Sequence, residues 1–297
     1  MPKSTDLSPA SAPAADGPTG NGEYRLLAAD EPSPVIAVNR DGSSPFVIVV
    51  DHAGRNLPRA LGDLGLPASE LQRHIAWDIG AFEVARRMAA ALAAPLVAQH
   101  YSRLVIDCNR DPGVASSIPV VGEWVDIPGN QGLSRSQAAA RRAEIFDPYH
   151  GYIRALLDAR QAAGRPTILV AQHSMTDVFK GERREMHAAV LYNRDRRFAG
   201  VVLDLLRAET GLVIGDNEPY FVSDATDFTV PRHGEARSLP HVEIEVRQDL
   251  LRDSAGQDEW GRRLARILRE AGRAFAGPPT AATELQASGA KPVAGKS

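Results

Sequence analysis

Short apolar runs rich in β-branched residues recur along this chain, and a histidine follows two of them after one polar residue. The run at 46–50 reads Phe-Val-Ile-Val-Val and is followed by Asp51 and His52. A second run, at 167–172, is followed by His173. A short continuous apolar run is typical of a strand that is covered on both faces of a sheet. These runs therefore limit the fold more than any other feature of the sequence.

Segments with the composition of helices separate the strand candidates. They span 79–94, 134–163, 194–210 and 256–275, and the further strand candidates are 96–100, 104–108, 188–192, 212–214 and 242–246. In 134–163, Ser134 suits the N-cap, Gly164 ends the segment and Pro148 should break or kink it. Residues 112–133 are rich in Gly and Pro and indicate a long loop. The alternation predicts an α/β fold with a mixed, largely parallel sheet and helices on both faces.

The two ends of the chain differ in composition from the rest. Residues 1–22 and 277–297 consist largely of Pro, Ala, Ser and Gly and contain few large apolar side chains. Such segments cannot bury enough surface to offset the entropy of ordering, so we expect two disordered tails. Residues 1–22 also lack the basic start and apolar run of a signal peptide. We expect residues 23–276 to form a single domain.

Composition excludes several classes of function. The chain has 34 Lys and Arg against 37 Asp and Glu, a net charge of −3, which argues against a broad nucleic-acid or anionic-membrane surface. The single cysteine, Cys108, excludes an internal disulfide and a Cys-x-x-Cys site. No apolar stretch approaches the length of a membrane span, and no Gly-x-Ser-x-Gly or phosphate-loop motif occurs. We expect a cytoplasmic protein that acts on a small molecule, and its oligomeric state stays open.

Polar clusters follow the strand candidates, where ligands bind in open α/β sheets. His52 and His173 are candidates for one metal site, although each could be a structural or solvent-facing histidine. Asp78 comes just before a helical segment and could simply cap it. Arg110, after Asn109, could hold a carboxylate with two parallel hydrogen bonds, or it could form a surface ion pair.

The segment at 241–249 alternates apolar and polar residues. On a strand, Glu243, Glu245 and Arg247 share one face, and the valines and isoleucine between them take the other. This polar face could be a solvated edge or could line a cleft. In a cleft, one of the glutamates could act as general base toward a metal-bound water.

Five segments in order resemble the N-formylglutamate amidohydrolase family. They are DHAGRNLP, WDIGAFEVAR, SRLVIDCNRD, QHSM and RHGEARSLPHVEIEVRQDLL, and the resemblance covers residues 46–251. It implies a fold similar to that of zinc carboxypeptidases and aspartoacylase, with one catalytic domain over 23–276. It also implies a metal-dependent enzyme that hydrolyses N-formyl-L-glutamate to formate and L-glutamate, a late step in histidine breakdown.

The resemblance implies that His52 and His173 are zinc ligands. The next ligand of the zinc carboxypeptidases is a glutamate three residues after the first histidine, but that position is Arg55 here, which cannot bind a metal. We choose Asp78 to complete the set, with the capping role as the alternative. Two histidines, one carboxylate and an open position make up a catalytic zinc site, and other divalent ions also fit such ligands.

The resemblance also implies roles around the metal. Asn109 and Arg110 would hold the substrate carboxylate, and Arg103 would stabilise the oxyanion. Glu245 would take the proton of the attacking water, with Glu243 as the alternative. Three further residues would line the pocket, with Arg247 suited to a second carboxylate: Arg247, His233 and Tyr220.

The expected substrate is thus a small anionic N-acyl amino acid. Two alternatives remain open: hydrolysis of another N-acyl amino acid or small amide, and a non-catalytic binding module on the same fold.

Overall fold

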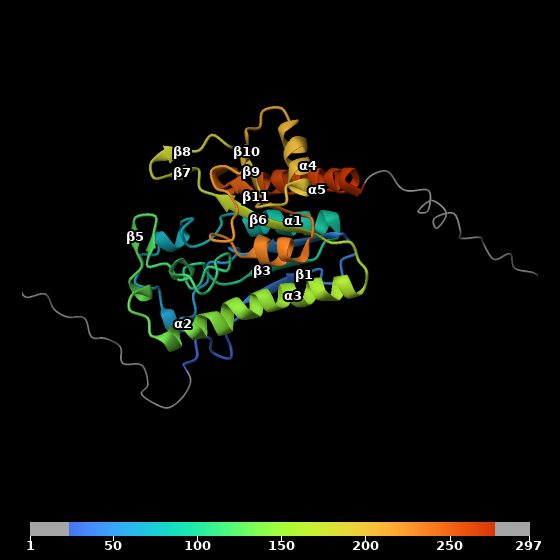
Figure 1. Cartoon of the computed structure of the whole chain (residues 1–297). Coiled ribbons are helices and arrows are strands. Elements are labelled where there is room, and N and C mark those ends of the chain that lie inside the picture. The colour runs from blue at the N-terminus through green and yellow to red at the C-terminus, as the bar shows by residue number, and fades with distance from the viewer. Residues whose placement is uncertain (1–23, 277–297) are drawn as a thin grey trace, which may run out of the picture.

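The computed structural model describes residues 24–276, and both predicted tails, 1–22 and 277–297, lie outside the described residues. A seven-stranded sheet forms the centre of the molecule (Figure 1). Its strand order is β1-β3-β2-β6-β11-β9-β10. The strands are β1 (Val35–Val38), β2 (Phe46–Val50), β3 (Leu96–Gln99), β6 (Ile168–Met175), β9 (Ala188–Leu191), β10 (Ile214–Asp216) and β11 (His241–Arg247).

The four central strands run parallel to one another. β3, β2, β6 and β11 pair in parallel register, β1 and β9 join them antiparallel, and β10 is parallel to β9. The prediction of a mixed, largely parallel sheet is therefore confirmed. Parallel pairing brings the carboxyl ends of β2, β6 and β11 to the same edge of the sheet, where the polar clusters follow.

Helices cover both faces of the sheet, as predicted. Alternate side chains of β2 separate into two cores: Phe46, Ile48 and Val50 pack with α1 (Ala81–Leu92), α4 (Arg197–Arg207) and α5 (Ser254–Ala276). Val47 and Val49 pack on the opposite face with α3 (Asp147–Ala162). Figure 1 shows α3 on one side of the sheet and the other three helices on the opposite side. Within residues 24–276, no helix combines the length and apolar character needed to cross a membrane.

The helical segment at 134–163 is interrupted, as Pro148 predicted. α2 (Arg135–Arg141) continues into a π-helical turn at 142–146 before α3 begins. Ser134 caps α2 and shares a capping box with Gln137. Pro148 lies in the first turn of α3, directly after the π-helical turn, and its missing N–H removes one hydrogen bond from the helical series there.

The prediction of a strand over 104–108 was wrong. These residues form turns, and side chains bind their carbonyl groups where a neighbouring strand would otherwise do so. The Asn130 amide donates to the carbonyl of Leu104 at 2.8 Å, and the buried Arg141 guanidinium donates to that of Val105 at 2.9 Å. The apolar run reflects burial of a loop, which pattern alone does not distinguish from a strand.

Two small hairpins lie beside the carboxyl edge of the sheet. The segment at 112–133, expected to be a loop, includes β4 (Val121–Gly122) paired with β5 (Val125–Asp126). β7 (Val178–Phe179) pairs with β8 (Glu182–Arg183) just after β6. The Lys180 ammonium lies 4.8 Å from the centre of the Trp124 ring, so the two hairpins contact each other.

Gly80, not Asp78, is the N-cap of α1. Gly80 has φ +77°, in the left-handed region, and a Cβ there would lie 2.4 Å from Leu251 Cβ and 2.8 Å from the Leu251 carbonyl oxygen. Glycine is therefore required for both its backbone angle and its lack of a side chain. The Asp78 carboxylate is free of the capping role and points to the carboxyl edge of the sheet.

We predict that Gly80→Ala destabilises the protein more than Gly164→Ala. Gly164 ends α3 with φ +63° and has no atom within 4 Å of a built Cβ, so its substitution costs only the left-handed backbone, about 1–2 kcal/mol. At Gly80 the collision with Leu251 adds about 1–3 kcal/mol. Urea unfolding of both variants measures the difference, and equal losses would contradict it.

Candidate active site

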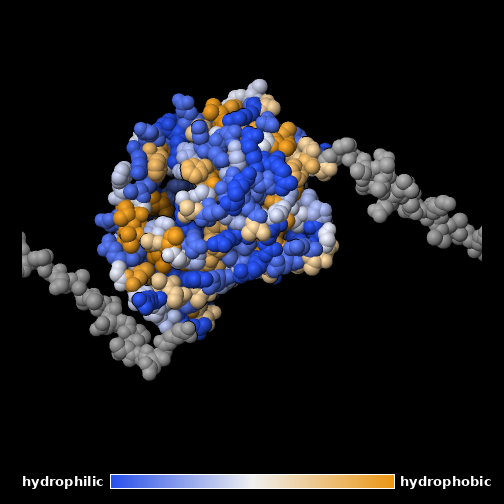
Figure 2. Space-filling model, viewed as in Figure 1, coloured by the Kyte–Doolittle hydropathy of each residue, from blue (hydrophilic) through white to orange (hydrophobic). Residues whose placement is uncertain are grey.

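A cavity of about 590 Å³ opens at the carboxyl edge of the sheet. Its walls include residues that follow or end β2, β6 and β11, together with the two hairpins and the segment at 219–227. Figure 2 shows a hollow in this face of the molecule, with hydrophobic residues at its edge. A cavity of this size is typical of a small-molecule site.

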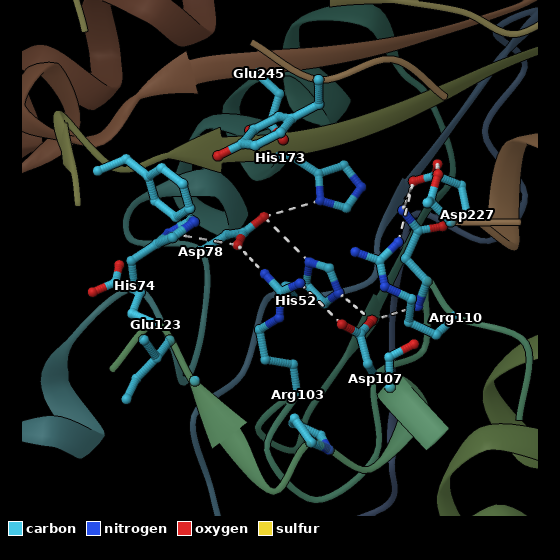
Figure 3. A pocket seen from close by; sticks show the side chains of 18 of the residues that line it. His52, His74, Asp78, Arg103, Asp107, Arg110, Glu123, His173, Asp227 and Glu245 are labelled. Atoms are coloured by element: carbon cyan, nitrogen blue, oxygen red, sulfur yellow. Dashed lines mark hydrogen bonds and ion pairs between the residues drawn. The ribbon is translucent and has the colours of Figure 1, made fainter. Parts of the chain in front are cut away.

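Three buried side chains converge in this cavity: His52, Asp78 and His173. One ligand atom from each lies within 4.8 Å of the others. His52 directly follows β2, His173 lies near the end of β6, and the Asp78 main-chain N–H donates to the His52 carbonyl at 2.9 Å. The sheet and this hydrogen bond therefore position all three, and the structure brings together the residues predicted as metal ligands (Figure 3).

Each imidazole is held between two carboxylates. His52 Nε2 lies 2.7 Å from Asp107 Oδ1, and His52 Nδ1 faces Asp78 Oδ2 at 3.5 Å. His173 Nε2 lies 3.4 Å from Asp51 Oδ2, and His173 Nδ1 lies 2.9 Å from the same oxygen of Asp78. In the tautomer with the proton on Nε2, His52 donates toward Asp107 and His173 donates toward Asp51. The Nδ1 lone pair of each ring then points at the Asp78 carboxylate. A carboxylate behind a histidine in this way is typical of metal-binding imidazoles.

These carboxylates change the acid–base properties of the histidines. Burial lowers the pKa of His52 and the charge of Arg103 adds to this, but Asp107 and Asp78 outweigh both and raise it. Burial also lowers the pKa of His173, whereas the carboxylates around it raise that pKa well above its usual value. Burial raises the pKa of Asp78, and the two imidazoles hold it well below the normal range. The site therefore favours positive charge between these side chains.

The donor set fits a divalent cation. His52 Nδ1, which faces Asp78, is buried and has no hydrogen-bond partner among the described residues. Two imidazole nitrogens and a carboxylate oxygen that meet in a buried space are the ligands of a catalytic zinc site, with room left on the cavity side. Other divalent ions also accept these ligands.

Arg103 joins the two carboxylates beside His52. Its guanidinium donates to Asp107 Oδ2 at 2.9 Å and to Asp78 Oδ1 at 3.4 Å. The side chain is 21% exposed and lines the cavity, so part of it can be reached from the cavity beside the metal-ligand cluster. Burial lowers the pKa of this group, but the surrounding carboxylates raise it further above its normal value, so Arg103 stays charged.

Glu243 and Glu245 both line the cavity from β11, and the alternate residues of that strand lie in the core, as the alternation predicted. Glu245 is in register with His173 on the neighbouring strand. One carboxylate oxygen of each glutamate is buried without a hydrogen-bond partner in the described part of the chain. Burial raises the pKa of Glu245 to about 7 and that of Glu243 well above its usual value. A carboxyl group that titrates near neutrality is suited to accept and return a proton.

Asn109 and Arg110, expected to hold the substrate carboxylate, lie on the other side of the cluster and line the cavity. The amide of Asn109 is occupied: it donates to Asp227 at 3.1 Å and accepts the main-chain N–H groups of 228 and 229 at 3.0 Å. Asn109 thus fixes a wall of the cavity. The Arg110 guanidinium is 4.0 Å from Asp227 and 30% exposed, so it is the group that remains available to a carboxylate.

The three other predicted pocket residues differ in their placement. Tyr220 lines the cavity, but Arg247 and His233 are not among the described residues that line it. Arg247 donates to the carbonyls of 184 and 185 at 3.0 Å and to Asp249 at 2.7 Å, so it fixes the segment before β9. His233 is buried against His150, 3.0 Å away, and burial lowers its pKa to about 3. The expected second carboxylate-binding group is therefore absent from the cavity wall.

Three residues of the site had no role in the sequence analysis. Asp51 and Asp107 support the two histidines from behind, and His74 lines the cavity with Nδ1 3.8 Å from Asp78 Oδ1. Asp107 is 55 residues from His52 in the chain, and no spacing rule connects them. Arg55, which replaced the expected ligand, lies outside the cavity with its guanidinium 5.2 Å from the Trp77 ring centre.

We predict that Tyr149→Phe weakens metal binding. Asp51 Oδ1 accepts hydrogen bonds from the Tyr149 hydroxyl at 2.9 Å and from Thr229 at 2.7 Å, and these fix the carboxylate behind His173. Loss of one should raise the Kd for zinc about tenfold, measured by competition with a chelating dye. Tyr152→Phe on the same helix is the control, since the Tyr152 ring packs against Arg40 and the core and its hydroxyl makes no hydrogen bond within the described residues. An unchanged Kd in Tyr149→Phe would contradict this role.

Comparison with known proteins identifies the same family as the five sequence segments. The sequence profile of the N-formylglutamate amidohydrolase family matches residues 44–252. Gene product Atu2144 of Agrobacterium tumefaciens is 34% identical, with a TM-score of 0.83 over 85% of this chain and 100% of that one. The N-formylglutamate amidohydrolase of Ralstonia eutropha JMP134 is 20% identical, with a TM-score of 0.61 over 81% of this chain and 97% of that one. No curated protein matches the chain.

The matched residues contain the whole cluster around Asp78 and both glutamates of β11. The relative from Ralstonia eutropha shares the fold. The profile covers most of the chain, so this protein belongs to the N-formylglutamate amidohydrolase family.

Proposed function

We propose that this protein is a metal-dependent amidohydrolase that cleaves the amide bond of an N-acyl amino acid. The observation that carries the proposal is the buried cluster of His52, Asp78 and His173 at the floor of the cavity, with the carboxyl group of Glu245 beside it. N-formyl-L-glutamate is the first substrate to test, because the family takes its name from it.

The three clustered side chains would hold the metal ion, with Asp107 and Asp51 behind the histidines. A divalent cation supplies a Lewis acid that polarises the amide carbonyl and makes water a stronger nucleophile at neutral pH. The remaining chemistry belongs to the side chains of the cavity.

Glu245 moves the proton in this proposal. Its carboxylate accepts a proton as the water oxygen bonds to the acyl carbon, and it returns that proton to the nitrogen when the carbon–nitrogen bond breaks. The products are a carboxylic acid and a free amine. Burial raises the pKa of this carboxyl group, which makes Glu245 a stronger base than an exposed glutamate.

Two arginines bind the negative charges of the reaction. Arg103 can be reached from the cavity beside the cluster and would donate a hydrogen bond to the oxygen that becomes negative in the tetrahedral intermediate. Arg110 would hold the α-carboxylate of the amino acid, and Asn109 would keep the neighbouring wall in place.

We predict that Glu245→Gln abolishes most of the activity. Glutamine has the same shape but cannot accept the proton, so kcat should fall about 10²–10⁴-fold while zinc content is retained. Glu243→Gln is the matched variant, two residues away on the same face of β11, and it should lose far less. If Glu243→Gln is the inactive variant instead, Glu243 is the base.

The proposed function can be tested in one preparation of the full-length protein. We expect one zinc ion per chain by elemental analysis and hydrolysis of N-acyl amino acids that stops when the metal is removed by a chelator and resumes when zinc is added. His52→Ala should lose both the metal and the activity, because it removes a ligand. Full activity without metal would contradict the metal-dependent mechanism, and bound zinc with no hydrolysis of any N-acyl amino acid would indicate a binding module.

A further inference from the structure

The cavity extends on two sides of the metal-ligand cluster. Figure 3 shows Arg110 and Asp227 on one side of His52 and Asp78, and His74 and Glu123 on the other. We call these the Arg110 side and the Glu123 side. A substrate whose carboxylate binds at Arg110 and whose amide lies at the cluster must place its acyl group on the Glu123 side.

The Glu123 side is mainly apolar. Among the lining residues, Ile75 and Val121 are close to His74 and Glu123 in the chain, and a Cβ built on Gly122 would lie 3.4 Å from Ile75. Phe179 of the β7–β8 hairpin also lines the cavity, and the Lys180 ammonium lies over both the Phe179 and Trp124 rings. Tyr220, in the segment after β10, lines the cavity and is linked to Phe179 through Arg184. The contact of Lys180 with Trp124 links the two hairpins on this side. The Arg184 guanidinium lies 5.0 Å from the Phe179 ring centre and 4.7 Å from that of Tyr220, and this stacking holds the two rings.

Negative charge is disfavoured on this side. The Glu123 carboxylate lines the cavity, and its only ion pair is with Arg73, which is not among the described lining residues. An acyl group that carried its own carboxylate would therefore meet the like charge of Glu123, and neither Lys180 nor Arg184 is among the described residues that line the cavity.

The cavity also lacks a place for a second carboxylate on the amino acid. Arg103 and Arg110 are the only arginines among its described lining residues, and no lysine lines it. Arg103 already binds Asp78 and Asp107. Arg247, the candidate for the second carboxylate, is held by backbone carbonyls outside the cavity.

We propose that the substrate has an uncharged acyl group larger than formyl, which lies against the Glu123 side, and an amino acid with a single carboxylate. This proposal rests on the proposed function and names the substrate class of the same site. The cavity volume of about 590 Å³ agrees with it, because a formyl group would leave the apolar walls of the Glu123 side in contact with water.

The test pairs two acyl groups with two amino acids of equal shape. The zinc-loaded full-length protein is given N-formyl and N-hexanoyl derivatives of L-glutamine and of L-glutamate, and kcat/KM is measured for each. We expect N-hexanoyl to exceed N-formyl by about tenfold or more, since each buried methylene stabilises the complex. We expect glutamine to exceed glutamate by about tenfold, because the second carboxylate has no cation.

A pair of neighbouring valines tests where the acyl group lies. Val121 is 50% exposed and lines the cavity, whereas Val120 is 47% exposed and is not among the lining residues. Val121→Glu should reduce the ratio of kcat/KM for N-hexanoyl to that for N-formyl about tenfold. Val120→Glu adds the same charge to the same loop and should leave this ratio unchanged.

The outcomes separate the inference from the function on which it rests. Hydrolysis in which N-formyl-L-glutamate is the best substrate would overturn the inference and keep the proposed function. Equal effects of the two valine substitutions would overturn the placement of the acyl group. If the zinc-loaded protein hydrolyses none of the derivatives, the proposed function itself fails.

Discussion

The site depends on the interaction of the Asp78 carboxylate with two buried imidazoles. One of its oxygens faces His52 Nδ1 and His173 Nδ1, at 3.5 and 2.9 Å. In a nearly dry interior, a carboxylate and two imidazole lone pairs can be stable together only with a positive charge between them, either protons or a metal ion. The pKa values of both histidines are raised and that of Asp78 is lowered for the same reason.

The fold supports this arrangement from several directions. β2 and β6 are parallel neighbours, so their histidines reach the same edge of the sheet. Gly80 lets the chain turn against Leu251 and leaves Asp78 outside the helix cap. Asp51 and Asp107 then orient the imidazoles from behind, and Tyr149 and Thr229 orient Asp51. Carboxylates that hold metal ligands in this way usually affect metal affinity almost as strongly as the ligands do.

The residues of the cavity fall into two groups, those that would cleave the amide bond and those that would bind the rest of the substrate. The groups near the cluster, Arg103 and the two glutamates of β11, would serve bond cleavage whatever the substrate. In the proposed function, recognition of the substrate would depend on the two sides of the cavity, one with Arg110 and the other with apolar walls and Glu123. Family membership says more about the residues that would cleave the bond than about those that would bind the substrate, since one catalytic arrangement serves many substrates.

The sequence by itself determined the α/β class, the faces of β11 and the two strand-end histidines of the cluster, because apolar periodicity and strand-end polarity are local properties. Asp78 was added to that cluster by the family resemblance, since its position before a helical segment also suits a cap. It did not distinguish the buried turns at 104–108 from a strand, since burial gives both the same apolar pattern. Only the tertiary structure decided which carboxylates support the histidines, and that Arg247 serves the backbone and not the cavity. These partners are far apart in the chain, and their contacts follow from how the strands and loops pack, which no local pattern records.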